Sequence, residues 1–350
     1  FNTGTLREAM LRAGLIDKLE CTDEDVTRVL GRYVDEQLLN YPIPQRKMNY
    51  YMVMAHRAIS EVLLHDGNYL YGVPPVLEAQ MVDKVERSVL DYERQRMSNI
   101  LRIVHEEISA VCELPPLQSF IEATIDKPLK YTPVLPRGEG QTNESYDEQQ
   151  KALDFCVQQV NLYLQPDSRF VHFPLIEGQA GSGKTFLFKL IILYCAACGL
   201  RFTLMSVTSE RSRTLGGEHI HLQLPIPTDP LTKKHTMTLI EKTIERLRND
   251  PEKLALLQRV SVIFIEEIGF LSREVYGIID GVLRTVCKNN LPAGGKLVVA
   301  NGDWRQLQPV DGQPFWCSSL LMTSFKVLSL KHFVRSATDP ILQRCLKAFN

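Results

Sequence analysis

The chain has 350 residues, of which 44% are hydrophobic and 23% charged, a composition typical of a folded globular protein and not of a disordered or membrane-spanning chain. Its formal net charge of -1 excludes a surface that is basic throughout, so any contact with a nucleic acid has to be local. The eight cysteines are scattered along the chain, which favours free thiols in a reducing compartment over a secreted disulfide scaffold.

The first third of the chain is predicted to be helical. Between residues 82 and 111, apolar residues recur every three or four positions, which is the period of a helix with one buried face. Five prolines and an aperiodic polar stretch follow between residues 114 and 145. Because prolines and aperiodic polar residues interrupt regular structure, we expect the main domain boundary there.

After residue 145 the pattern changes to short apolar runs that alternate with helical segments. The runs that we expect to be strands are 173–176, 202–207, 260–265, 297–300 and 327–330. Strands that alternate with helices predict a mostly parallel sheet with helices on both faces.

The longest apolar run, residues 186–200, is interrupted by Lys189 and is too short to cross a bilayer. No secretion signal opens the chain, so we expect no membrane anchor. Cys195 and Cys198 in this run have C-x-x-C spacing, but structural zinc needs four ligands, so buried thiols are the better interpretation.

A phosphate-binding motif lies between a strand-like and a helix-like run. Residues 178–185 read Gly-Gln-Ala-Gly-Ser-Gly-Lys-Thr and match G-x-x-x-x-G-K-S/T. The glycines let the backbone N–H groups point at phosphate oxygens, and the following helix adds the positive end of its dipole. A chance match arises in a chain of this length about once in a hundred. We therefore predict nucleotide binding, with these cofactor-binding residues: Gly178, Gly181, Ser182, Gly183, Lys184 and Thr185.

Within this motif Lys184 would reach the β and γ phosphates, and the Thr185 hydroxyl would hold Mg²⁺.

A second feature supports the same chemistry, because Glu266 and Glu267 directly follow the strand-like run 260–265. A P-loop ATPase needs one carboxylate near Mg²⁺ and often a second that activates the attacking water. We predict Glu266 as the metal carboxylate and Glu267 as the catalytic base. Without the phosphate motif, a solvated strand end would be the better interpretation.

Taken in order, these segments resemble the Pif-type DNA helicases of superfamily 1B, and especially the helicase part of Helitron transposon proteins. Residues 294–296 read Gly-Gly-Lys and residues 302–307 read Gly-Asp-Trp-Arg-Gln-Leu, which resemble G-G-K and G-D-F-R-Q-L of that family. The resemblance covers about residues 146–350 and, more faintly, the N-terminal module. It implies a motor with two RecA-like lobes that moves 5′-to-3′ along single-stranded DNA and hydrolyses ATP between the lobes.

The resemblance also implies the motor's surroundings. By the resemblance, the motor would use ATP and Mg²⁺ as cofactors and would bind single-stranded DNA. It would work in the nucleus, in DNA repair, recombination or transposition. No membrane partner is expected.

Further residues are assigned by the resemblance. Gln149, at the end of the run Tyr-Asp-Glu-Gln, would read adenine; the alternative is an ordinary helix N-terminus. Gln306 would couple the γ phosphate to the DNA-binding loops, while Trp304, in place of the usual Phe, would pack rather than stack on a base. Arg335 ends a run, residues 330–335, that resembles L-x-x-N-M-R, so it would touch the γ phosphate from the second lobe.

The DNA-contacting segments match the family only in part. Thr208 and His221 stand where the family has P-T-G-x-A-A and G-G-x-T-x-H, and both are predicted DNA contacts. Val207 and the charged residues 210 and 211 replace the expected proline and small residues. For His221 the alternative is a core histidine whose ring is satisfied by a neighbouring carbonyl.

The predicted fold is α/β, a P-loop NTPase (RecA-like) parallel sheet with a separate all-α N-terminal module. We expect a helical N-terminal module at 1–113, a Pro-rich linker at 114–145, a RecA-like ATPase lobe at 146–330, and the start of a truncated second lobe at 331–350. An arginine finger is worth roughly 10³ to 10⁵ in rate, so without the rest of that lobe we expect ATP binding but weak hydrolysis.

Two alternatives stay open. A truncated, transposon-derived remnant would bind nucleotide or DNA without unwinding, and the altered DNA segment and Glu266 favour it. The other alternative is a small-molecule P-loop kinase, but it does not explain why the run Gly-Asp-Trp-Arg-Gln-Leu is present at residues 302–307.

Glu266 stands where the family has Asp, and its extra methylene group moves the carboxylate relative to the metal. Because Mg²⁺ demands near-ideal octahedral geometry, we expect this residue to slow hydrolysis. Glu266→Asp should therefore raise ATP turnover in a complete motor, as measured by steady-state phosphate release. Unchanged or lower turnover would contradict this interpretation.

Overall fold

The computed structural model describes residues 75–139, 141–165, 171–208, 210, 214–227, 236–306, 309, 311–332 and 334. The helices predicted before residue 75, and Arg335 with the segment after it, lie outside the described residues. The chain forms two compact units, Phe1–Glu93 with Glu245–Leu256, and Arg94–Ile244 with Leu257–Asn350. The sheet and the candidate site belong to the second unit.

The described elements follow the predicted alternation of helices and strands. In chain order they are α4 (Pro75–Ser109), α5 (Leu117–Ala123), α6 (Asn143–Tyr163), β1 (Phe173–Gly178), α7 (Lys184–Ala197), β2 (Phe202–Ser206), β3 (Glu218–His219), α9 (Ile220–Gln223), α10 (Thr236–Arg248), α11 (Pro251–Arg259), β4 (Val262–Glu266), η1 (Ile268–Phe270), α12 (Arg273–Val286), η2 (Pro292–Gly295), β5 (Leu297–Gly302), η3 (Phe315–Cys317), α13 (Ser319–Ser324) and β6 (Phe325–Leu330).

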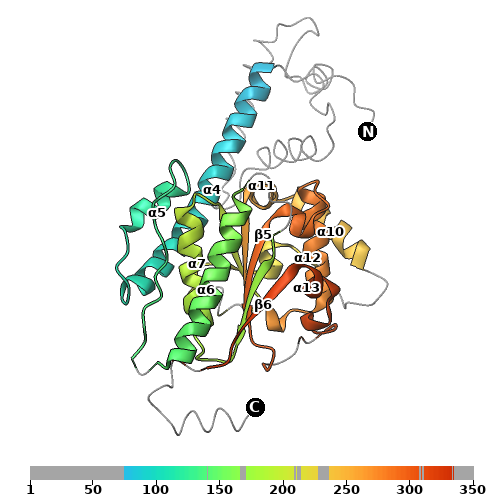
Figure 1. The fold of residues 1–350 in the computed structure, drawn as a ribbon. Helices are drawn as coiled ribbons and strands as arrows, with labels where there is room; N and C mark the ends of the chain where they lie inside the picture. The colour runs from blue at the N-terminus through green and yellow to red at the C-terminus, as the bar shows by residue number, and fades with distance from the viewer. Residues whose placement is uncertain are drawn as a thin grey trace, which may run out of the picture. The chain divides into compact units, whose positions relative to one another are not determined.

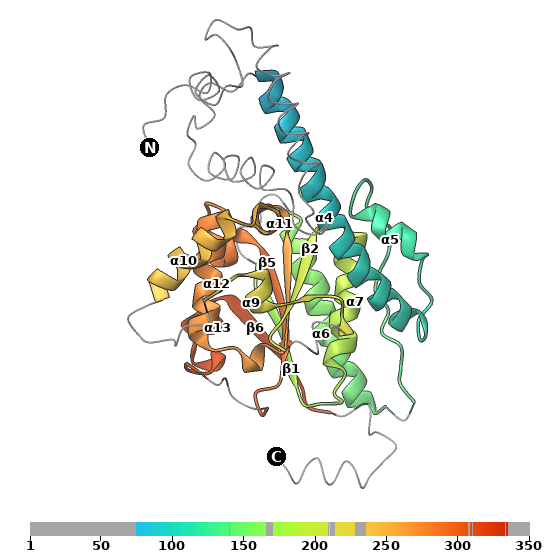
Figure 2. The same cartoon turned by 180° about the vertical axis from the view of Figure 1, so that it is seen from behind.

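One parallel sheet organises the second unit (Figure 1). In the described part of the chain its six strands have the order β3-β2-β4-β5-β1-β6, and every pairing is parallel. Helices α6 and α7 cover one face, and α12 and α13 cover the other (Figures 1 and 2). Strands covered on both faces need apolar residues at every position, and β1, β2, β4 and β5 are buried along their whole length. The α/β, RecA-like fold is confirmed.

The strand order places the functional segments next to one another. Strand β5 lies between β1 and β4. Because parallel strands end at the same edge of a sheet, the residues that follow β1, β4 and β5 come together there. These segments are the phosphate motif, the two glutamates and the run that contains Gln306. In open parallel sheets this edge is where ligands bind.

Helix α7 follows the phosphate motif and crosses the core. Its residues are buried almost without exception, and Phe188 packs edge-on against Phe264 of β4 at 5.2 Å between ring centroids. Lys189 is buried too, and its charge is paired with Glu107 of α4. Burial raises the pKa of the Cys195 thiol well above its usual value, so this thiol stays protonated and unreactive. The described cysteines, Cys195 and Cys198 among them, are free.

The proline-rich stretch is more structured than a plain linker. It contains helix α5, and Phe120 and Leu135 within it are buried. Phe120 packs edge-on against His105 of α4 and against Tyr131. The stretch therefore forms part of the same compact unit as the sheet, because its few large apolar residues find partners there.

The run at residues 294–296 has a structural role. Gly294 and Gly295 have φ of 65° and 79°, and a Cβ at Gly294 would lie 2.5 Å from the carbonyl oxygen of Leu283. Lys296 is buried, and its Nζ donates to the carbonyl oxygens of Gln258 (3.1 Å) and Val260 (2.6 Å). Burial lowers the pKa of Lys296. The lysine thus connects the start of β5 to the segment that precedes β4.

In the described part of the chain, every helix is too short or too polar to span a lipid bilayer.

Candidate functional site

The phosphate motif forms a tight loop between β1 and α7. Gly181 and Gly183 have φ of 87° and 91°, which is strained for any residue with a side chain. A Cβ at Gly183 would lie 2.1 Å from Nε2 of Gln149, and a Cβ at Gly178 would lie 2.7 Å from the carbonyl oxygen of Leu330. The loop is therefore packed from outside, and only glycine fits at these positions.

Polar side chains inside the loop fix its shape. Ser182 is buried, and its hydroxyl donates to the carbonyl oxygen of Gln179 at 2.9 Å. Lys184 is also buried, and its Nζ donates to the carbonyl oxygens of Gly178 and, at 2.9 Å, of Gln179. The ammonium group thus lies over the loop, where phosphate oxygens would compete for it.

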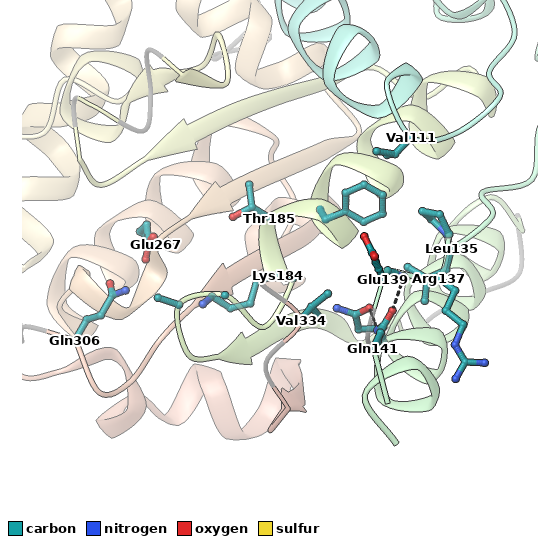
Figure 3. A pocket seen from close by; sticks show the side chains of 17 residues that line it. Val111, Leu135, Arg137, Glu139, Gln141, Lys184, Thr185, Glu267, Gln306 and Val334 are labelled. Carbon is teal, nitrogen blue, oxygen red and sulfur yellow. Dashed lines mark hydrogen bonds between the residues drawn. The ribbon is translucent and has the colours of Figure 1, made fainter. Parts of the chain in front are cut away.

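A cavity of about 670 Å³ opens at this end of the sheet. Figure 3 shows Lys184 and Thr185 between two groups of side chains. Glu267 and Gln306 lie on one side, and the other side holds Leu135, Arg137, Glu139 and Gln141. The predicted site residues that line the cavity are Gln149, Gly181, Gly183, Lys184, Thr185, Glu267 and Gln306. Gly178, Ser182 and Glu266 belong to the same loop and strand end but are not among the lining residues.

The two glutamates differ in position although they are consecutive. Glu266 is the last residue of β4 and is 1% exposed. Glu267 follows in a left-handed conformation, with φ 59° and ψ 44°, and its side chain lines the cavity. A left-handed residue turns the chain out of the strand, so only the second carboxylate reaches the cavity wall.

A chain of amide hydrogen bonds joins the proline-rich stretch to the phosphate loop. The Gly138 N–H donates to Oε1 of Gln141 (3.0 Å), and Nε2 of Gln141 donates to Oε1 of Gln149 (2.8 Å). Nε2 of Gln149 donates to the carbonyl oxygen of Ser182, again at 2.8 Å. Gln141 is not among the residues predicted from the sequence, because no motif marks it and its partner is defined only by the packing of α6.

The segment after β6 lies against the same loop. The Val334 N–H donates to the carbonyl oxygen of Gly181 at 2.9 Å. Glu148, next to Gln149, accepts from the Lys331 N–H at 2.9 Å and pairs with Nδ1 of His332 at 3.0 Å. Val334 is therefore attached to the phosphate loop, and Lys331 and His332 are attached to α6.

Thr208 and His221 are described but are not among the residues that line the cavity. Thr208 follows β2, and its N–H donates to the Ser206 hydroxyl at 3.3 Å. Nδ1 of His221 lies 3.4 Å from the carbonyl oxygen of Ile226, and its ring stacks on His219 at 5.6 Å. Burial lowers the pKa of His221, so its ring is neutral near pH 7. The carbonyl contact is the one that the core-histidine alternative expects, but His221 is only half-buried. The DNA role of both residues stays a prediction.

Helix α4 holds the segment that leads to His221, a contact that the sequence analysis also missed. Arg96 forms an ion pair with Glu218 at 2.9 Å, and Nδ2 of Asn99 donates to the carbonyl oxygen of Gly216 at 3.5 Å. These residues are more than a hundred positions apart in sequence, so no local pattern could reveal the contact.

Several known proteins are similar to this chain in sequence. A family model described as "PIF1-like helicase" matches residues 146–344. An ATP-dependent DNA helicase Pif1 from Psychrobacter sp. is 31% identical over 136 residues, which are 39% of this chain and 19% of the relative. One from Bdellovibrio bacteriovorus is 28% identical over 202 residues, 56% of this chain and 41% of the relative. The chain thus spans less than half the length of these relatives.

Among solved structures, the fold is similar to a Pif1 helicase from Bacteroides crystallised with ADP-AlF3 and single-stranded DNA. The TM-score is 0.42 at 23% sequence identity, and the match covers 55% of this chain and 44% of the other.

The amide chain predicts an effect of Gln141 on nucleotide binding. Gln141→Ala removes the donor to Gln149, and because a lost hydrogen bond costs about 0.5 to 1.5 kcal/mol, we expect an ATP analogue to bind roughly 2- to 10-fold more weakly. A titration with a fluorescent ATP analogue measures this.

The matched control is Gln150→Ala, because the Gln150 amide bonds to Asp154 on the same helix and should leave the affinity unchanged. Equal affinities for the two variants would show that the amide chain does not act on the loop.

Proposed function

The chain belongs to the PIF1-like helicase family, and we propose that its phosphate loop and acidic pair form the ATPase centre of a 5′-to-3′ DNA helicase. The observation that supports this most is the common cavity. Lys184 and Thr185 of the phosphate loop, Glu267 after β4 and Gln306 after β5 all line it. Phosphate gripping, water activation and phosphate sensing need these groups within reach of one another.

The residues present fit a nucleoside triphosphate with a divalent cation. Glycines at positive φ let the loop backbone curl tightly, and helix α7 begins at Lys184, so the positive end of its dipole lies at the loop. The Thr185 hydroxyl, which lines the cavity, is an oxygen ligand of the kind that Mg²⁺ prefers. The Glu266 carboxylate has the same chemistry, but it is buried at the end of β4 and does not line the cavity, so its role toward Mg²⁺ rests on the resemblance to the family. ATP supplies the transferable phosphoryl group, and Mg²⁺ neutralises charge that develops on it.

Each residue then has a defined role. Lys184 exchanges its bonds to the loop carbonyls for bonds to the β and γ phosphates. Glu267 accepts a proton from the attacking water as the bond between the γ phosphorus and ADP breaks. Gln306 carries the state of the γ phosphate to the DNA-contacting segments, where we keep Thr208 and His221 as proposed contacts with single-stranded DNA. Arg335, which follows the segment tied to the loop through Val334, is the proposed γ-phosphate contact of a second lobe.

The proposed organisation follows from these roles. We keep the helical module at 1–113 and the ATPase lobe at 146–330 as proposed domains, and the stretch at 114–145 joins them while belonging to the same compact unit as the sheet. A second lobe that begins at 331 would complete the cleft in the working motor. Because a γ-phosphate arginine is worth roughly 10³ to 10⁵ in rate, hydrolysis in the motor would depend on Arg335 from that lobe. A DNA motor works where the cell keeps its DNA, and we keep the nucleus as the proposed compartment.

A nucleotide-binding remnant without motor activity is the second candidate. Glu266 in place of the family's Asp favours it, because that change affects the carboxylate proposed for the metal.

ATP hydrolysis with and without single-stranded DNA separates the two candidates. For a motor we expect slow hydrolysis that DNA stimulates and that Lys184→Ala abolishes, because the phosphates lose their only lysine from the loop. Lys151→Ala is the matched control, since Lys151 is exposed on α6 and should leave the rate unchanged. ATP binding without hydrolysis, with or without DNA, would support the remnant and contradict the motor.

A further inference from the structure

The main chain at Glu267 is held in an unfavourable conformation. Within the described residues, Glu267 is one of three non-glycine residues with positive φ; the others are Lys288 and Ala293. Such a conformation costs free energy for a residue with a Cβ, and it persists only where surrounding contacts impose it. At functional sites it commonly directs a reactive side chain. The contact that imposes it at Glu267 is therefore part of how the carboxylate is placed.

That contact comes from Asn301. Asn301 lies near the end of β5, where it pairs with Ile176 of β1, and it is one residue beyond Ala300, which pairs with Ile265 of β4. Its Oδ1 accepts from the Glu267 N–H at 3.0 Å, and the side chain is 1% exposed. Because an amide is neutral, it accepts this bond without adding a third negative charge beside the two glutamates.

In the described residues, the same kind of hydrogen bond occurs at one other left-handed residue, in a turn outside the site. Ala293 has φ 51°, and its N–H donates to Oδ1 of the buried Asp280 at 2.7 Å. In both places a buried side-chain oxygen accepts from the N–H of a left-handed residue. At Ala293 the turn carries a methyl group, whereas at Glu267 it carries a carboxylate into the cavity.

The rest of the Asn301 side chain argues against a purely structural role. Among the described residues Nδ2 of Asn301 has no hydrogen-bond partner, although it is buried between two central strands. A buried donor without a partner destabilises the fold, and an apolar residue of similar size would avoid that cost. The benefit of asparagine here lies in its oxygen and in what that oxygen holds.

We propose that Asn301 is a positioning residue for ATP hydrolysis: its Oδ1 fixes the left-handed turn at Glu267 and so directs the carboxylate into the cavity beside Lys184 and Gln306. Neither the phosphate motif nor the resemblance to helicases assigns this role to Asn301. The proposal rests on the proposed function of Glu267 as the base.

A double-mutant cycle in single-turnover hydrolysis tests the proposal. With the 350-residue chain in excess over ATP, we expect Asn301→Ala to slow hydrolysis by roughly 10- to 100-fold, since a misplaced group costs up to about 10²-fold. Binding of a fluorescent ATP analogue should be unchanged. In the Glu267→Gln background, Asn301→Ala should slow the reaction no further, because it acts through Glu267. A second loss of the same size there would overturn the proposal.

The matched control is Thr203→Val. Thr203 is buried in β2, and its hydroxyl has no partner among the described residues, so the variant changes a buried polar group away from the site. Its hydrolysis rate should equal that of the parent chain. Thermal unfolding of each variant shows whether it is folded.

A measurement without turnover separates this proposal from the proposed function. Hydrogen exchange of the Glu267 amide should be slow in the parent chain, fast in Asn301→Ala, and slow in Asn301→Asp, which keeps an acceptor oxygen. If the parent chain does not hydrolyse ATP, the proposed function fails and exchange alone decides whether Asn301 holds the turn. An unprotected Glu267 amide in the parent chain, or hydrolysis that Asn301→Ala leaves unchanged, would overturn the proposal.

Discussion

Parallel pairing of β4, β5 and β1 is the constraint on which the site depends. These strands start at different points in the sequence, but the ladder fixes their ends at one edge of the sheet. The phosphate loop follows β1, Glu267 follows β4, and Gln306 follows β5. A shift of one residue in either pairing would exchange the side chains that pack under the helices of one face for those of the other, so the packing of the core also fixes the geometry of the polar groups. The chemistry is therefore a consequence of the packing.

Neutral amides complete this arrangement. Gln149 and Gln141 link the phosphate loop to the segment before α6, and Asn301 links the end of β5 to the turn after β4. An amide can accept and donate at once without changing the charge of the site. Lys184 and two glutamates already set that charge, so amides are suited to hold the loop and the turn in place.

Much of the fold and part of the site could be predicted from the sequence. Long apolar runs predicted the central strands because both faces of the sheet are covered, and the phosphate motif is local, so its residues could be named. Contacts between distant segments could not be predicted: Gln141 to Gln149, Arg96 to Glu218 and Asn301 to Glu267 depend on packing. Trp304, expected to pack, lies edge-on to Trp316 at 5.7 Å between ring centroids. Arg335 lies outside the described residues.

Backbone hydrogen exchange with and without ATP and Mg²⁺ shows whether the three separate segments form one nucleotide site. We expect ATP to slow exchange together in residues 178–185, in the peptide that contains Glu266 and Glu267, and in residues 302–306. Protection confined to residues 178–185, with the other two segments unchanged, would contradict this expectation.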